Sequence, residues 1–261
     1  MKISIIIPYF NRKNTISRCI NSIFKDDLQN IDIDVIVVND FSEQPVPNLN
    51  VKNIRILNLE KNMGPVAARS FGADVALGDY FLFLDSDDEL CPGWSNRLLS
   101  EIQAADFVGF PYAGFNQKED VFISSSFDYW KWTASDSRAS DYIWCVKKQA
   151  YRKHQWPKLN ISELWYFSQI FDSNLTAKYC KNPLYIYHQD AGNQVSKSRQ
   201  YRFKLTNYEK KSIRYSIKIF YKDKAMIKAF SPVLYSAWKK SLIKQSLLSL
   251  NLFNAVAILV A

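Results

Sequence analysis

Four short, mostly apolar runs in the first 84 positions constrain the fold of this chain more than any other feature. They are ISIII at 3–7, IDVIVV at 33–38, IRILNL at 54–59 and YFLFL at 80–84. Runs of this length and composition are typical of strands buried on both faces. Residues 14–26 carry apolar residues at helical spacing, and Pro65 suits the first turn of a helix that runs to about 77. The order βαββαβ predicts an α/β domain whose mostly parallel sheet is covered by helices.

Polar segments follow three of these four expected strands. They are PYFNR after the first strand, NDFS after the second and DSDDE after the fourth. In sheets of this kind, ligands bind at the carboxyl ends of the strands, so we expect the three segments to form one site. The strand ends carry acids rather than glycines, and neither GxGxxG nor GxxxxGK[ST] is present. This disfavours a dinucleotide dehydrogenase and a P-loop ATPase.

The acidic segment, residues 85–89 (DSDDE), places three Asp carboxylates within four positions. Like charges at this spacing repel one another, and a bound cation removes the repulsion. Carboxylate oxygens select Mg²⁺ or Mn²⁺, and Mg²⁺ usually combines one or two carboxylates with phosphate oxygens of its substrate. The segment therefore indicates a metal site that also holds a diphosphate. The alternative is a helix N-terminus rich in acid, which the helix dipole favours.

The chain has 261 residues, enough for one large domain or two small ones. In its second half the patterns are mixed. Short strands are expected at 107–110 and 184–187, and helices at 94–104, 145–154 and 163–172. The four cysteines lie far apart, so neither a zinc knuckle nor a CxxC pair is expected. The first apolar run is too short for a signal peptide, which predicts a cytoplasmic location.

Positive charge gathers in residues 197–261, which hold 14 Lys and Arg residues against two acidic ones. The chain as a whole has a formal net charge of +9. After Lys244 come 17 uncharged, largely apolar residues, which is marginal for crossing a bilayer. Basic residues beside an apolar stretch favour a helix lying on an anionic membrane surface. The alternatives are a contact with a partner or second copy, and core packing. Nucleic acid is disfavoured, because no recognised binding module accompanies the charge.

Four segments of the chain, taken in order, resemble the family-2 inverting glycosyltransferases with the GT-A fold. They are SIIIPYFNR at 4–12, VIVVNDFS at 35–42, NMGPVAARSFGADVALGDYFLFLDSDDEL at 62–90 and PLYIYHQDAGNQVS at 183–196. The resemblance implies a GT-A domain over residues 1–196. Its first half, 1–90, would bind the nucleotide, and its second half, 91–196, the acceptor. Residues 197–261 would form a basic, helical C-terminal extension.

The resemblance also implies roles for individual residues. Asp40 would accept hydrogen bonds from the base or ribose; the family usually has two acids here, whereas this chain has Asn39 and Asp40. Arg69 would approach the base or the phosphates, where a planar guanidinium is useful. Asp87 would ligate the metal, and Asp88 would reach the donor sugar or order the turn. The whole set implied for the nucleotide is Pro8, Tyr9, Phe10, Asn11, Asp40, Arg69, Asp85 and Ser86.

The catalytic base is the least constrained position. The family places an acidic pair before an aromatic-rich helix, and the corresponding segment here, NISELWYFSQIF at 160–171, has the single carboxylate of Glu163. Glu163 is the predicted base, and Asp136 and Asp141 are the alternative candidates. If Glu163 aligns with the first acid of the pair, Leu164 occupies the position of the base. An acid at a helix N-terminus is the structural alternative.

Two further features have both a functional and a structural interpretation. His188 is a predicted metal or pyrophosphate contact by resemblance, and a surface histidine after a strand otherwise. The segment FDYWKW at 127–132 places aromatic rings beside Lys131, so Trp130 and Trp132 are predicted to contact the donor sugar or acceptor, with core packing as the alternative. His154 has no counterpart in the family pattern and is expected to be structural.

The sequence thus predicts an inverting, metal-dependent glycosyltransferase. It would use Mn²⁺ or Mg²⁺ and move one sugar from a UDP- or GDP-linked donor to a hydroxyl of a lipid-linked bacterial surface glycan. The enzyme would lie at the inner face of the cytoplasmic membrane. Two alternatives remain open: a sugar nucleotidyltransferase, and a non-catalytic glycosyltransferase-like scaffold, which the single acid at Glu163 keeps possible.

Overall fold

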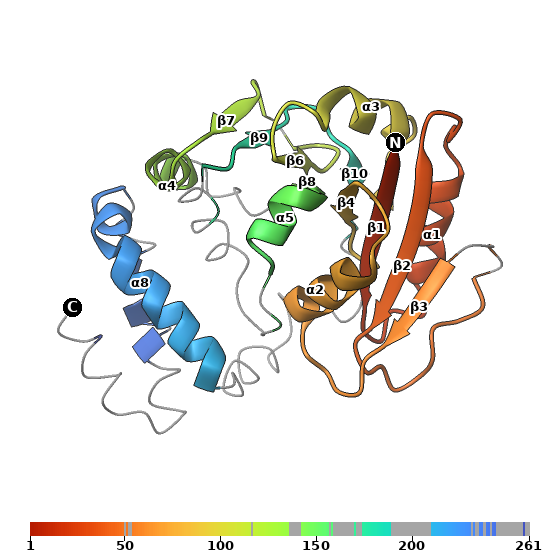
Figure 1. The fold of residues 1–261 in the computed structure, drawn as a ribbon, viewed down its shortest axis with the longest axis horizontal. Coiled ribbons are helices and arrows are strands. Elements are labelled where there is room, and N and C mark those ends of the chain that lie inside the picture. Colours follow the sequence, from red (N-terminus) through yellow and green to blue (C-terminus); the bar gives the residue numbers. More distant parts are fainter. Residues whose placement is uncertain are drawn as a thin grey trace.

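The computed structural model in Figure 1 describes residues 1–49, 51, 54–115, 117–135, 142–156, 158, 170, 174–188 and 210–230, and single positions from 232 to 258. Its strands are β1 Lys2–Tyr9, β2 Asp32–Asn39, β3 Ile54–Asn58, β4 Tyr80–Phe83, β5 Glu89–Leu90, β6 Phe107–Pro111, β7 Val121–Ile123, β8 Tyr142–Lys147, β9 Ala177–Tyr179 and β10 Tyr185–Ile186. The described helices are α1 Ile16–Phe24, α2 Pro65–Val75, α3 Trp94–Glu101, α4 Ser126–Ser135, α5 Lys148–Lys153 and α8 Lys210–Phe230.

Eight strands form one sheet in the order β3-β2-β1-β4-β8-β6-β9-β7. The first four strands of the chain pair in parallel, which confirms the strands expected from the apolar runs. β3 is an edge strand with a neighbour on one side only, and it leaves Ile56 48% exposed. The prediction of a strand buried on both faces is therefore wrong for β3.

The side chains of β1 alternate between two cores on opposite faces of the sheet. Ile5 and its odd-numbered neighbours pack with Ile20 of α1 and Trp94 of α3. Ile6 packs in the other cluster, with Val66 of α2 and Tyr151 of α5. Helices cover both faces (Figure 1), as the continuous apolar strands predicted.

The second half of the chain extends the sheet through β8, which lies antiparallel between β4 and β6. The helix expected over 145–154 is wrong in its first part, because Cys145 pairs with Leu82 on one side and Val108 on the other. This two-sided pairing overrides the local helical pattern, and α5 begins only at Lys148. The helix expected over 163–172 lies outside the described residues, apart from the buried, helical Ile170.

The basic C-terminal segment contains the 21-residue helix α8, which lies beside α4 (Figure 1). The rings of Phe127 and Phe230 meet edge to face with centroids 4.8 Å apart. Phe220 and Ile227 are fully buried in the same core cluster as Tyr151. One face of α8 therefore packs on the domain.

The tight approach of α2 to the sheet yields a prediction. A Cβ added at Gly72 would lie 2.5 Å from Ile6 Cγ2 and 3.0 Å from Val38 Cγ2. We expect Gly72→Ala to lower the free energy of unfolding in urea by about 1–3 kcal/mol, because overpacking outweighs the better helix propensity of alanine.

Val75→Ala, at the exposed end of the same helix, serves as the control and should change stability by less than about 0.5 kcal/mol. A Gly72→Ala protein as stable as the wild type would contradict this packing of α2.

Candidate functional site

The strand pairings bring the three predicted polar segments to one edge of the sheet. Tyr9 pairs with Asn39 at the ends of β1 and β2, and the Asp40 N–H donates to the Tyr9 carbonyl at 2.8 Å. On the other side of β1, the Leu84 N–H donates to the Ile6 carbonyl at 3.1 Å, just before the acidic segment. The carboxyl edge of β2, β1 and β4 is therefore the candidate site, as the sequence predicted.

The acidic segment is faced by three arginines from other parts of the chain. Asp85 is paired with Arg69 of α2. The nearest nitrogen of Arg12 lies 3.4 Å from Asp87 Oδ2. The third pair joins Arg18 of α1 to Glu89, with Nε 3.3 Å from Oε1, and Arg18 also donates to the Asp87 carbonyl at 3.0 Å. Alternating charges thus hold the acidic segment in place.

The Arg69 side chain is also held in place by an aromatic ring. Its side chain is only 10% exposed, and its guanidinium lies 5.7 Å from the ring centroid of Trp156. Trp156 in turn packs on Phe83 at the end of β4, with ring centroids 4.3 Å apart. A cation over an aromatic face is stabilised and kept at a fixed angle. Arg69 is thereby oriented toward the acidic segment, and its predicted contact with the base or the phosphates stays a prediction.

Asp88 is the most buried carboxylate of the acidic segment, at 4% exposure. Its Oδ1 makes no hydrogen bond within the described part of the chain. Burial, and then the charges of Asp85 and Asp87, raise the pKa of Asp88 to about 8. The pKa of Asp87 is also raised, by burial and by Asp85, although Arg12 and Arg18 act in the opposite direction. A further positive charge would relieve both carboxylates.

The donor set is compatible with a divalent cation. The segment offers hard carboxylate oxygens, including the unpartnered buried Oδ1 of Asp88. Mg²⁺ and Mn²⁺ need only one or two such carboxylates when substrate phosphates complete the shell. Within the described residues, no group of three or more His, Cys, Asp or Glu side chains is arranged to hold a metal ion. A site here would therefore depend on oxygen atoms from the substrate.

His188 is brought to the acidic segment by the small sheet of β5 and β10, in which Ile186 pairs with Glu89. The His188 Nε2 lies 2.7 Å from Glu89 Oε1. The ring thus lies against Glu89, and the His188 backbone N–H also donates to the Asp88 carboxylate. The predicted contact with a metal stays a prediction. His154, expected to be structural, is half-buried, and burial with the charges of Lys153 and Lys222 lowers its pKa.

Asp40 helps to build the edge of the site. Its carboxylate is 3% exposed and accepts the Met63 N–H at 2.6 Å and the Gly64 N–H at 2.8 Å, at the start of α2. Burial raises the pKa of Asp40, and these two hydrogen bonds act against the rise. Asp40 therefore fixes the loop that precedes Arg69, and its predicted contact with the base or ribose stays a prediction.

In the segment PYFNR, which begins at the end of β1, some side chains are buried in the core and others reach the surface. Pro8 and Tyr9 are buried, and the Tyr9 ring belongs to the core cluster on the α1 side. Phe10 is 40% exposed. Asn11 has a positive φ of 53° and accepts the Glu43 N–H at 3.0 Å through its side chain. Phe10 and Asn11 are thus the members of this motif that offer surface to a ligand.

The predicted acceptor and base residues are only partly described. Trp132 packs on Tyr179 with ring centroids 3.9 Å apart and on Tyr142 at 6.0 Å, which favours the core-packing alternative. Trp130 belongs to α4, but its side chain is not among those that the structure describes. Glu163, Asp136 and Asp141 lie wholly outside the described residues. Ser86 is buried within the acidic segment.

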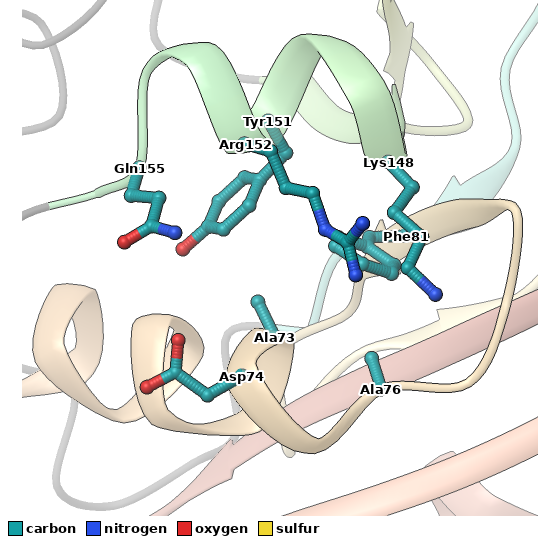
Figure 2. A pocket seen from close by; sticks show the side chains of 8 residues that line it. All are labelled: Ala73, Asp74, Ala76, Phe81, Lys148, Tyr151, Arg152 and Gln155. Carbon is teal, nitrogen blue, oxygen red and sulfur yellow. The ribbon is translucent and has the colours of Figure 1, made fainter.

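A cavity of about 220 Å³ lies between the C-terminal half of α2 and α5, as Figure 2 shows. It borders Phe81 at the beginning of β4, whereas the acidic segment follows the end of that strand. This cavity therefore belongs to the opposite end of the sheet from the candidate site. Its lining is Ala73, Asp74, Ala76, Phe81, Lys148, Tyr151, Arg152 and Gln155.

The sequence profile described as Glycosyl transferase family 2 matches residues 4–155, more than half of the chain. The chain belongs to this family. The matched range includes β1, β2, β4 and the acidic segment, so the edge described above lies within the family's shared part. The predicted GT-A architecture of the domain is confirmed by similarity to solved structures.

Among the relatives is YwdF of Bacillus subtilis (strain 168), described as an uncharacterized glycosyltransferase. It is 40% identical over 114 residues, which are 41% of this chain and 41% of YwdF. TarS of Staphylococcus aureus (strain Mu50 / ATCC 700699), a poly(ribitol-phosphate) β-N-acetylglucosaminyltransferase, is 34% identical over 94 residues, 34% of this chain and 16% of TarS. The alignments thus span less than half of these family 2 relatives.

A crystal structure of S. aureus TarS 1–349 in complex with UDP-GlcNAc superposes with a TM-score of 0.65. The superposition covers 99% of this chain and 89% of that chain at 18% sequence identity. At this identity the similarity shows a shared fold.

Arg12 and Arg18 are site residues that sequence reasoning did not single out. Arg12 closes the first motif, PYFNR, and Arg18 lies in the helix that follows it. The signal was available in principle, because the closely spaced acids of the segment after β4 need compensating cations nearby. Which cations those are depends on the fold, since Arg18 and Asp87 are 69 positions apart.

The raised pKa of Asp88 yields a prediction about stability. Its pKa of about 8 in the folded state lies above the value of about 3.9 for an unfolded chain, so the wild-type protein loses stability as pH rises between these values. Asp88→Asn removes that loss. We expect its stability gain over wild type, measured by urea unfolding in EDTA, to be larger at pH 8 than at pH 5 by at least about 1 kcal/mol.

The exposed Glu60 provides the control: Glu60→Gln should shift stability equally at the two pH values. A pH-independent effect of Asp88→Asn would show that Asp88 is ionised in the folded protein at pH 5.

Proposed function

We propose that this chain transfers one sugar from a UDP-linked donor to a hydroxyl group of a glycan, with inversion at the anomeric carbon. The observation that carries the proposal is the acidic segment at the carboxyl edge of a family 2 fold, faced by Arg12, Arg18 and Arg69. Such a mixed charge array suits a ligand that carries phosphates and a cation together. A nucleotide diphosphate with a divalent metal is that kind of ligand.

Uridine diphosphate is the proposed nucleotide, with support from one relative, TarS. The solved structure of S. aureus TarS 1–349 holds UDP-GlcNAc, and the name of TarS describes an N-acetylglucosaminyltransferase acting on poly(ribitol-phosphate). In this chain the exposed Phe10 and the half-buried Asn11 follow the carboxyl end of β1, which lies between those of β2 and β4. We assign the base and ribose to this part of the edge.

Asp87 and Asp88 would hold Mn²⁺ or Mg²⁺ together with phosphate oxygens of the substrate, and a contact of His188 with the metal or the pyrophosphate stays a prediction. Bound there, the ion would supply positive charge that offsets the charge developing on the leaving diphosphate. Arg12 is paired with Asp87 and Arg69 with the neighbouring Asp85, and both arginines are proposed to turn to the phosphates. Guanidinium groups bind phosphate oxygens in pairs, so they keep the diphosphate in one orientation.

Glu163 is the proposed general base. It would accept the proton of the acceptor hydroxyl as the hydroxyl oxygen attacks the anomeric carbon from the face opposite the diphosphate. A single displacement of this kind inverts the configuration. We propose that the acceptor is part of a bacterial surface polysaccharide, in line with the named substrate of TarS.

The roles of Asp87 and Glu163 predict a loss of activity. We expect Asp87→Asn and Glu163→Gln each to lower the transfer of sugar from UDP-GlcNAc in the presence of Mn²⁺ by about 100-fold or more. Product analysis by NMR should show an inverted anomeric configuration. Asp32→Asn, which changes an exposed acid at the start of β2 and so at the opposite edge of the sheet, is the matched control and should keep full activity.

Full activity in Asp87→Asn would refute the metal site. Loss in Asp87→Asn with full activity in Glu163→Gln would assign the base to another residue.

We further propose that α8 binds an anionic membrane surface, where a lipid-linked acceptor would be met. Lys218, Lys222 and Lys228 are exposed on this helix, whereas Phe220 and Ile227 are buried. Each basic residue near an anionic leaflet contributes about 1 kcal/mol. In the part of the chain that the structure covers, none of the helices has the length and apolar character needed to cross a bilayer. Binding at the surface therefore requires no spanning segment among them.

Charge reversal on α8 tests this membrane proposal. We expect the triple variant Lys218→Glu, Lys222→Glu, Lys228→Glu to bind vesicles of phosphatidylglycerol and phosphatidylcholine at least about tenfold more weakly in co-sedimentation. The matched control reverses three exposed lysines elsewhere, Lys25, Lys118 and Lys181. Equal binding of the α8 variant and the control would refute the proposal.

A further inference from the structure

Phe41, the residue after Asp40 at the exit of β2, has a backbone conformation that phenylalanine rarely adopts. Its φ is +62°, in the left-handed region. Glycine takes this region freely and asparagine tolerates it, but a bulky side chain there is a strained outlier. Such strain persists only where the surrounding structure imposes it, and it concentrates at functional sites.

The hydrogen bonds on both sides of Phe41 impose this conformation. The Asp40 N–H donates to the Tyr9 carbonyl at 2.8 Å, so the chain before Phe41 is held to β1. The Ser42 N–H donates to Asn39 Oδ1 at 3.0 Å, which turns the chain back toward the end of β2. Phe41 is therefore the residue across which the backbone must reverse, and any residue at this position would take a positive φ.

Packing does not offset the strain. The Phe41 side chain is 58% exposed, and it belongs to neither core cluster. Among the described residues it makes no contact with another aromatic ring. A folded chain would be more stable with glycine here, and an exposed apolar ring also carries a solvation cost. The stability of the fold therefore does not explain why this position carries a phenylalanine.

The position of Phe41 relates it to the candidate site. β1 lies between β2 and β4, so the exit of β2 is about 10 Å from the acidic segment, two strand spacings away. A nucleoside diphosphate is long enough to span this distance, with its phosphates at the acidic segment. Phe10, 40% exposed at the exit of β1, lies between them. The far end of such a ligand is its flat base.

We propose that Phe41 is a further donor-binding residue, which stacks on the nucleobase of the donor. The inference rests on the proposed function, because it takes the ligand to be a nucleoside diphosphate. An aromatic face binds a base by stacking, without selecting among bases by hydrogen bonds. Phe41 therefore supplies affinity for the nucleoside, whereas the acidic segment and its arginines bind the diphosphate.

Calorimetric titration of the full chain with UDP and with GDP, in the presence of Mn²⁺, tests the inference. We expect Phe41→Gly to weaken binding of the preferred nucleotide by roughly 5- to 100-fold, the range for loss of one base–aromatic stack. The same substitution should raise the Tm by about 2–4 °C, because the strain is removed. Phe41→Tyr, which keeps the ring, should bind as the wild type does.

Phe122→Ala removes a ring that is 63% exposed on β7, away from the carboxyl edge, and is the matched control. Its nucleotide affinity should equal that of the wild type. Wild-type affinity in Phe41→Gly would overturn the inference and leave the proposed function intact. A fall in the Tm of Phe41→Gly would overturn the argument from strain. A wild-type protein that binds neither UDP nor GDP would refute the proposed function itself.

Discussion

The candidate site depends on charge compensation around the acidic segment after β4. Its carboxylates would repel one another at this spacing, and each of three arginines, from the first loop, α1 and α2, neutralises one of its acids. Asp88 is left buried without an ion pair among the described residues. A cation bound there, as proposed above, would balance the charge of an ionised Asp88. This is the physical reason to expect a metal, and a diphosphate that the metal and the arginines bind together.

The parallel sheet makes this compensation possible. Since β4, β1 and β2 run side by side, their exits meet at one edge, although the segments are far apart in sequence. Hydrogen bonds then hold the exits to one another: Asp40 links β2 to the start of α2, and Arg69 follows one turn later. The same restraint forces Phe41 into the left-handed region. The backbone strain at Phe41 and the cluster of charges around the acidic segment thus both result from bringing the loops after β1, β2 and β4 together.

Much of this arrangement could be predicted from the sequence, because the parallel strands are continuous apolar runs that can be recognised without knowledge of the fold. The acidic segment could be predicted because it directly follows one of these runs. Arg69 could be predicted because the family resemblance implies a role for it. β8 was missed, since Tyr142–Lys147 form a strand only through pairing with β4 and β6. Arg12, Arg18 and the strain at Phe41 follow from contacts across the fold, which no local pattern contains. Glu163 lies outside the described residues, so its role rests on the sequence.

The most direct measurement is a crystal structure of the protein soaked with UDP and Mn²⁺, with anomalous diffraction recorded at the manganese edge. The account predicts one strong anomalous peak beside Asp87, bridging to the diphosphate, with the salt bridge between Arg12 and Asp87 opened. A crystal in which UDP binds elsewhere, or in which Asp87 keeps its arginine and no manganese appears, would contradict it.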